Sequence, residues 1–215
     1  MASPRNNFIY FYSLKLLVEE LRDAYGFQYW WPAESPFEVI EGAILTQNTS
    51  WKNAEKSVFK IRDADASQLM QIGNEELHEK IRHSGFHRNK AIFLKNAASF
   101  YNEEIEIRPS FIDTGAELIR IRGIGKETAD SIALYAFHQR TFPVDSYTVR
   151  LLDRYFGLDL SIKDYEMIRD EFIRTFPTEM LMEAHALIDE HSKKYCRKKP
   201  LCSGCYINKN CTFYQ

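Results

Sequence analysis

Apolar residues recur at helical spacing along most of the 215-residue chain, and residues that interrupt helices are few. The segment 36–47 is an example, with apolar side chains three or four positions apart at Phe37, Ile40, Ala43 and Ile44. The chain contains only 9 glycines and 7 prolines, and the alternating pattern of strands is nearly absent. This pattern predicts an all-α protein of many short helices joined by short loops.

The expected helices cover most of the chain. They span 8–25, 36–47, 53–62, 66–71, 74–82, 88–102, 113–120, 126–138, 146–156, 163–175 and 178–191. The length suits one large domain or two small ones. Because no low-complexity linker occurs, a second lobe is expected to combine segments that are distant in sequence.

The composition is that of an ordinary soluble globular protein, with 45% hydrophobic and 27% charged residues. No apolar run approaches the roughly 20 residues of a membrane helix. The N-terminal residues lack the pattern of a signal peptide. We therefore expect a cytoplasmic protein.

The net charge of −2 conceals an asymmetry, because residues 191–215 contain no acid. Their basic residues are Lys193, Lys194, Arg197, Lys198, Lys199 and Lys209. This basic tail carries +6 and leaves −8 on the rest of the chain. Such asymmetry is a hint of a nucleic-acid footprint, and a solvated tail without a partner explains it equally well.

All four cysteines lie in the basic tail, at Cys196, Cys202, Cys205 and Cys211, in the pattern C-x5-C-x2-C-x5-C. Disulfides are disfavoured in a chain without an export signal. Four thiolates suit either zinc or a 4Fe-4S cluster, and the spacing leaves both open. Either metal would fold the loop and fix its basic residues, which favours a structural role.

A glycine hairpin, Gly123-Ile124-Gly125, precedes the helix expected at 126–138. The two glycines allow a tight turn with positive φ. The first amides of the helix and its dipole favour an anion, and Arg120, Arg122 and Lys126 add positive charge. The hairpin can therefore hold a phosphate, and a plain corner between two helices is the alternative.

Asp145 follows Gly125 by twenty residues and stands directly before the helix expected at 146–156. Aspartate is a common helix N-cap. From this residue alone, capping is the simpler interpretation.

These motifs together resemble a known family. IRGIGKETAD followed by PVDSYTVR is similar to the helix–hairpin–helix and Gly/Pro–Asp signature of the endonuclease III superfamily of DNA glycosylases. The cysteines, with HSKKYC leading into them, resemble that family's iron–sulfur loop, although the first gap is one residue shorter than the common pattern. ILTQNTS at 44–50 resembles the segment with a residue that enters the duplex, here Gln47. The resemblance spans about residues 35–215.

The resemblance implies a two-lobed all-α fold, with DNA and the active site in the cleft between the lobes. The expected lobes are 34–140 and 1–33 plus 141–215. Asp145 is the implied catalytic acid, and the four cysteines are the implied ligands of a 4Fe-4S cluster. The implied contacts to the DNA backbone are Arg122, Gly123, Ile124, Gly125, Lys126 and Thr128. The expected partner is double-stranded DNA with a damaged base, bound by a monomer associated with the nucleoid.

The hairpin helix also bears on the mechanism. Bifunctional members of the family carry a lysine at the position that Glu127 occupies here, and Lys126 lies about 100° away on a helix. A Schiff-base nucleophile is therefore not expected. The resemblance then implies a monofunctional enzyme, in which Asp145 stabilises an oxocarbenium-like sugar and orients water.

The stretch YWWPAESPF supplies a clue to the substrate. Trp30, Trp31 and Trp51 are predicted to bind the flipped base together with Gln47, because aromatic faces stack on bases and attract cationic ones by about 0.5–2 kcal/mol. Core tryptophans are the alternative. WWP before LTQNT resembles the bacterial 3-methyladenine glycosylase branch, some of whose members lack the cluster cysteines.

The sequence thus predicts a monofunctional glycosylase for alkylated purines such as 3-methyladenine. A bifunctional endonuclease III acting on oxidised pyrimidines is the first alternative. A non-catalytic DNA-binding module is the second.

Overall fold

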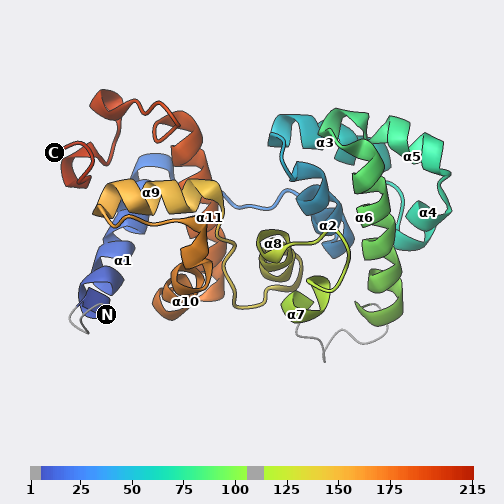
Figure 1. Cartoon of the computed structure of the whole chain (residues 1–215), viewed down its shortest axis with the longest axis horizontal. Helices are drawn as coiled ribbons and strands as arrows, with labels where there is room; N and C mark the ends of the chain where they lie inside the picture. Colours follow the sequence, from blue (N-terminus) through green and yellow to red (C-terminus); the bar gives the residue numbers. More distant parts are fainter. Residues whose placement is uncertain (1–5, 106–113) are drawn as a thin grey trace. The chain divides into compact units, whose positions relative to one another are not determined.

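The computed structural model describes residues 6–105 and 114–215 (Figure 1). Every regular element within these residues is a helix or a helical turn, so the all-α prediction is confirmed. None of the helices in this part of the chain carries an apolar stretch long enough to cross a membrane.

The chain divides into two compact units. One, here called the contiguous unit, is the single segment Trp31–Gln139. The other, here called the split unit, combines the residues up to Trp30 with Arg140–Gln215. Each unit has its own buried apolar core.

The contiguous unit contains seven labelled helices in its described residues. They are α2 (Pro36–Thr46), α3 (Trp51–Ile61), α4 (Ala66–Gln71), α5 (Asn74–Lys80), α6 (His87–Phe100), α7 (Thr114–Leu118) and α8 (Lys126–Phe137). α2 packs against α3, α6 and α8, and its Ile40, Ile44 and Leu45 are buried. α2 is therefore the central helix of this unit.

Local caps explain where several of these helices begin. The side chain of Ser35 accepts a hydrogen bond from the Glu38 amide at 3.1 Å, and Pro36 supplies the first helical residue of α2. A capping box between Asp65 and Gln68 starts α4. Such caps satisfy amides that have no partner within the helix.

The split unit is built from α1 (Asn6–Tyr25), α9 (Ser146–Phe156), α10 (Tyr165–Thr175) and α11 (Thr178–Lys194). α11 packs against the other three helices. The buried rings of Phe142 and Phe172 stack with their centroids 3.7 Å apart. This core spans both segments of the unit, because Leu17 and Leu21 of α1 are buried with it.

The end of α11 lies three residues beyond the predicted end at residue 191. Lys193 and Lys194 reach back one turn to Asp189 and Glu190, with nitrogen–oxygen distances of 2.5 and 2.6 Å. Positive charges in a last turn also favour the helix dipole. The additional turn is therefore stabilised by side chains rather than by apolar periodicity.

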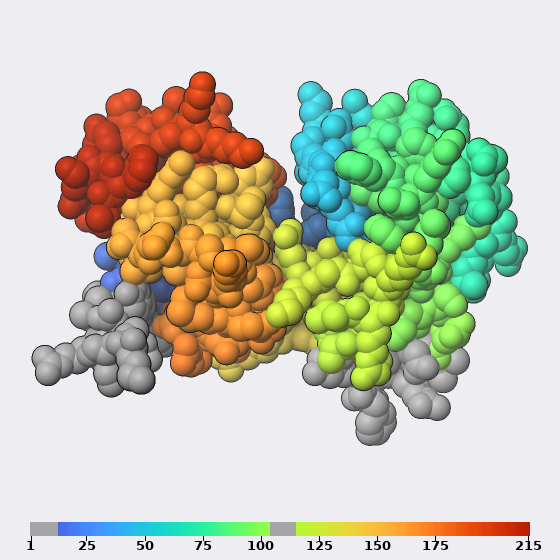
Figure 2. All heavy atoms as spheres, in the orientation of Figure 1, coloured from blue at the N-terminus to red at the C-terminus, as the bar shows by residue number. Residues whose placement is uncertain are grey.

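Residues 196–211, here called the cysteine segment, follow α11 and contain two 3₁₀ turns, Cys202–Gly204 and Asn208–Asn210. Figure 2 shows this segment in red on the surface of the split unit. Two arginines of α9 bind it: Arg150 donates to the carbonyl of Cys196 at 2.7 Å, and Arg154 donates to that of Arg197 at 2.7 Å.

Candidate functional site

The two glycines of the hairpin have different conformations. Gly123 has φ +100°, and a Cβ at this position would lie 2.1 Å from ring carbons of Phe93. Gly125 has φ −90°, and a Cβ there would meet nothing within 4 Å. The expected positive φ is therefore right for Gly123 and wrong for Gly125, where the bare backbone leaves open space in front of α8.

The beginning of α8 is exposed, and the basic side chains there, Arg122 and Lys126, outnumber the acidic Glu127. Gly125 caps the helix without a side chain, so it leaves the first amides of α8 for another acceptor. Arg122 and Lys126 are exposed, whereas Ile124 is buried and anchors the hairpin. These features suit an anion at the helix terminus.

Gln47 stands at the C-cap of α2 and contacts the hairpin. Its Nε2 donates to the carbonyl of Gly123 at 2.9 Å and to the hydroxyl of Thr128 at 3.0 Å. Sequence reasoning assigned Gln47 and Thr128 to DNA and did not foresee this contact. Here they hold the end of α2 to the hairpin.

Two of the three tryptophans form an aromatic cluster in the contiguous unit. The ring of Trp31 lies 5.4 Å from that of Trp51 at 85°, and 5.4 Å from that of Tyr135. A Cβ on Gly42 would lie 2.9 Å from the Trp31 ring, so this glycine lets the indole rest against α2. Trp51 also lines an open groove of about 600 Å³ along α3.

Trp30 belongs to the split unit and is partly exposed. Its ring meets the edge of His185, with centroids 6.2 Å apart, and the Lys193 ammonium lies 5.5 Å from its centroid. The sequence predicted that all three tryptophans contact the flipped base. In the structure Trp31 packs against Trp51, whereas Trp30 packs against the Lys193 ammonium.

Asp145 caps α9 with its own side chain. Its Oδ1 accepts a hydrogen bond from the Thr148 amide at 2.7 Å, which fixes the orientation of this half-buried carboxylate. The capping interpretation is therefore confirmed. Capping leaves a catalytic role open, because it engages one carboxylate oxygen.

Two titratable residues of α11 interact electrostatically with Asp145. Burial lowers the pKa of His185, opposed by the charges of Asp145 and Asp189, so the imidazole is neutral at neutral pH. Burial raises the pKa of Asp189, opposed by its bond to Lys193. Sequence reasoning missed His185 and Asp189, although their spacing of four places them on one helix face.

Two further residues were missed in the contiguous unit. Glu41 is 1% exposed, and its Oε1 has no hydrogen-bond partner among the described residues. Burial, and then the neighbouring Glu38, raise the pKa of Glu41 well above its ordinary value. The sequence signal for Glu41 was an acidic residue inside the apolar run VIEGAIL.

Phe86 is 70% exposed at φ +46°, and follows Gly85 at φ +69°.

The four cysteines form no disulfide, and Cys196 is buried while the others are half-buried. Side-chain nitrogens approach two of the sulfurs: Arg154 Nη1 lies 3.5 Å from Cys196 Sγ, and His191 Nε2 lies 3.5 Å from Cys205 Sγ. The amide of Ile207 favours the thiolate of Cys205. The amides of Phe213 and Tyr214 favour that of Cys211. Donors therefore approach the sulfurs of Cys196, Cys205 and Cys211, and the carbonyl of Arg154 also lies 3.7 Å from Cys211 Sγ.

The thiols are also close enough to influence one another. The pKa of Cys205 is raised first by burial and then by the other three cysteines. In the described residues, however, no three His, Cys, Asp or Glu side chains are arranged to hold a single metal ion. The four thiolates of a 4Fe-4S cluster would each bind a different iron, so they need not converge on one point as the ligands of a single ion do.

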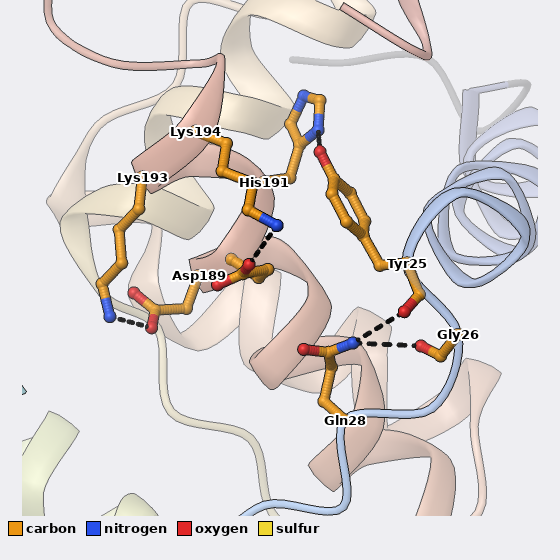
Figure 3. Close-up of polar contacts among 8 residues, drawn as sticks. Tyr25, Gly26, Gln28, Asp189, His191, Lys193 and Lys194 are labelled. Carbon is orange, nitrogen blue, oxygen red and sulfur yellow. Dashed lines mark hydrogen bonds and ion pairs between the residues drawn. The ribbon is translucent and has the colours of Figure 1, made fainter.

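His191 lies 3.5 Å from Cys205 Sγ through Nε2, and Figure 3 shows the hydroxyl of Tyr25 directed at its other ring nitrogen. Burial lowers the pKa of His191 to about 4, so its imidazole is neutral at neutral pH. Burial raises the pKa of Tyr25, which therefore remains a phenol. The phenol oxygen lies 2.9 Å from Nδ1 of His191.

The helical fold, the glycine hairpin that opens α8 and the aspartate that caps α9 together define a helix–hairpin–helix protein. Residues 42–178 match the HhH-GPD superfamily base excision DNA repair protein, and the chain belongs to this family. It is therefore an enzyme that acts on N-glycosyl bonds of DNA, which sets aside the non-catalytic alternative.

The chain is 44% identical over 203 residues to a protein of Methanocaldococcus jannaschii assigned as a DNA repair glycosylase, covering 89% of this chain and 92% of the relative. It is 30% identical over 184 residues to endonuclease III of Sulfolobus acidocaldarius, covering 83% and 82%. Among solved structures, H. pylori 3-methyladenine DNA glycosylase bound to 1,N6-ethenoadenine matches with a TM-score of 0.71 and 27% identity, covering 87% of this chain and 97% of that one.

Proposed function

We propose that the protein is a monofunctional DNA glycosylase that releases alkylated purines, such as 3-methyladenine, from double-stranded DNA. The observation that carries the proposal is the aromatic cluster of Trp31, Trp51 and Tyr135 against Gly42. Similarity to the H. pylori 3-methyladenine glycosylase supports the same substrate class.

An aromatic cluster suits a base that is cationic. N3-alkylated adenine carries positive charge, so an indole face attracts it by about 0.5–2 kcal/mol. Trp31 and Trp51 are better candidates than Trp30, because the Lys193 ammonium already lies 5.5 Å from the Trp30 ring. The cationic base is also a good leaving group and needs little protonation.

Asp145 is the proposed catalytic residue. The Thr148 amide holds one carboxylate oxygen, so the side chain keeps one orientation during the reaction. Its negative charge stabilises the oxocarbenium-like sugar, and its free lone pairs orient water. His185 nearby is neutral and therefore does not cancel this charge.

The proposal of a monofunctional mechanism rests on Glu127. This residue lies in the exposed first turn of α8, where bifunctional members carry lysine. Without that amine no imine forms with the sugar, and water completes the reaction.

The proposed DNA contacts come from the hairpin and the basic tail. The hairpin contributes the α8 amides with Arg122 and Lys126, and the tail contributes Arg197, Lys198 and Lys199, which are exposed. Lys193 and Lys194 contribute less, because Asp189 and Glu190 already offset their charges. We expect a monomer that acts on nucleoid DNA in the cytoplasm.

We further propose that Cys196, Cys202, Cys205 and Cys211 hold a 4Fe-4S cluster. The absence of disulfides among them and the N–H groups directed at Cys196 and Cys205 support this ligand set. When bound, the cluster would supply structural cross-links and a redox-active centre. The purified protein should contain iron and sulfide, and stoichiometric zinc without iron would overturn this proposal.

The second candidate is a bifunctional endonuclease III that removes oxidised pyrimidines and cleaves the strand. The 30% identity to the Sulfolobus acidocaldarius endonuclease III favours it. Lys126, next to Glu127, is the nearest amine that could act as its nucleophile.

The two candidates differ in the released base and in the fate of the strand. Purified protein should release 3-methyladenine from alkylated duplex, leave the strand intact until alkali is added, and form no adduct with borohydride. Release of an oxidised pyrimidine with strand cleavage and a trapped adduct would establish the second candidate. Loss of the adduct in Lys126→Ala would then identify the nucleophile.

A further inference from the structure

His191 connects the cysteine segment to the N-terminal helix of the split unit. It lies on α11 and is 1% exposed. Its Nε2 is 3.5 Å from Cys205 Sγ, and its Nδ1 is 2.9 Å from the hydroxyl of Tyr25, the last residue of α1 (Figure 3). The imidazole therefore bridges a cysteine and a residue 166 positions earlier in the chain.

The direction of these two hydrogen bonds is fixed once Cys205 is a thiolate. A thiolate only accepts hydrogen bonds, so the ring nitrogen that lies 3.5 Å from Cys205 Sγ must be one that carries a proton. Nε2–H therefore donates a hydrogen bond to the sulfur, in the tautomer that has this single ring proton. Nδ1 becomes an acceptor, so the Tyr25 hydroxyl must donate to it. Tyr25 thereby selects the tautomer of His191 that serves the sulfur.

Aromatic packing holds this arrangement in place. The ring of Tyr25 meets the edges of His191 and Tyr206, with centroids 5.9 and 5.8 Å apart. Tyr195 lies 5.8 Å from His191 and 5.4 Å from Tyr206. The Lys194 ammonium lies 5.1 Å from the Tyr25 centroid. The imidazole is thus enclosed on several sides and keeps its orientation toward Cys205.

We propose that Tyr25 and His191 form a hydrogen-bond relay that positions an N–H on the Cys205 thiolate, raises the reduction potential of the cluster and slows its loss. This inference rests on the 4Fe-4S cluster proposed above. An N–H donor withdraws electron density from a ligating sulfur, which favours the reduced cluster. Tyr25 and His191 are positioning residues, because neither touches substrate.

Three variants of the full chain, purified with their cluster, test the relay. Tyr25→Phe removes only the hydroxyl and keeps the ring packing. His191→Leu removes both hydrogen bonds. Tyr206→Phe is the matched control. The hydroxyl that it removes belongs to the same group of aromatic residues, but it forms its hydrogen bond with Tyr195 rather than with His191. The readouts are iron content, midpoint potential and the rate at which a chelator bleaches the visible band.

Both Tyr25→Phe and His191→Leu should shift the midpoint to lower potential, with the larger shift for His191→Leu. Chelator should remove iron from His191→Leu about tenfold faster than from wild type. Tyr206→Phe should match wild type. In His191→Gln the side-chain amide always carries N–H groups, so no partner is needed to place the proton. Adding Tyr25→Phe to this variant should therefore change the midpoint potential and the bleaching rate little.

Two outcomes oppose the relay and are distinguishable. Wild-type potential and bleaching rate in Tyr25→Phe and His191→Leu, at full iron content, would overturn the relay alone. Wild type without iron and sulfide would overturn the cluster and the relay together, and base release would still report on the glycosylase separately. If His191→Leu fails to fold, the conservative Tyr25→Phe decides the question.

Discussion

The hairpin of the contiguous unit and the cysteine segment of the split unit both follow a helix and turn sharply, but different groups hold them. In the hairpin the backbone conformation decides the shape, with Gly123 at positive φ against Phe93 and α8 amides that have no side-chain cap, and the Gln47 side chain adds a bond to the Gly123 carbonyl. The cysteine segment depends on side chains: Arg150 and Arg154 bind its carbonyls, and His191 approaches a sulfur.

The difference teaches where each unit is sensitive to substitution. A backbone site tolerates changes of exposed side chains but not of its glycine. A site held by side chains tolerates neighbouring substitutions that leave those side chains in place. It loses its hydrogen bonds when one of the bonding side chains is replaced. The following predictions test this division, from the largest expected effect to the smallest.

Asp145→Asn should have the largest effect, since it removes the one side-chain charge proposed for catalysis. Base release should fall by about 10²–10³, equivalent to about 3–4 kcal/mol in the barrier. Asparagine is also a good N-cap, so the melting temperature should change little. Single-turnover release of 3-methyladenine measures the effect, and near wild-type activity would show that another group performs the chemistry.

Gly123→Ala should destabilise the contiguous unit by about 2–4 kcal/mol, because alanine is strained at φ +100° and overlaps Phe93. Gly125→Ala should cost less than about 1 kcal/mol. Urea unfolding measures both. In a Phe93→Ala background, Gly123→Ala should lose the steric part of its cost and keep the part that comes from the backbone conformation. Equal costs at the two glycines would refute a hairpin shaped by Gly123.

Glu41→Gln should stabilise the contiguous unit at neutral pH, because the amide does not have to be ionised in a buried position. Burial raises the folded pKa of Glu41, so its stability contribution is full below its ordinary pKa near 4.5 and is lost as pH rises through the folded pKa. Urea unfolding between pH 4 and 9 should therefore show a flatter profile in the variant. If the variant folds but no longer releases base, Glu41 is instead a second catalytic acid. The contiguous unit would then also depend on a single functional side chain.

Lys198→Glu combined with Lys199→Glu should have the smallest effect. If both lysines contact phosphates, the slope of log affinity against log salt should fall by about 2. Lys194→Gln is the control, because Glu190 already offsets that charge. Fluorescence anisotropy with an abasic duplex measures the slopes, and equal slopes in all three proteins would place the basic tail away from DNA.

Features set by neighbours in sequence could be predicted. α4 and α9 have the predicted bounds, because a capping aspartate and local periodicity define them. The need for glycine at position 123 also followed from the hairpin pattern.

Features that depend on tertiary packing could not be predicted. The sequence places Trp30 beside Trp31, but the peptide between them is where the chain passes from one unit to the other. The contact of Gln47 with Gly123 joins residues 76 positions apart. The charge of the basic tail was overestimated, because the acids that pair with Lys193 and Lys194 stand just before it.

The split unit has a consequence for biosynthesis. Its first helix leaves the ribosome long before α9, α10 and α11, whereas Trp31–Gln139 emerges as one uninterrupted piece. At about 5–20 residues per second, Tyr25 waits on the order of 10–30 s for His191, which lies 166 positions later. During that interval α1 displays Leu17 and Leu21 without their partners, so nascent chains are candidates for chaperone capture until α11 is synthesised.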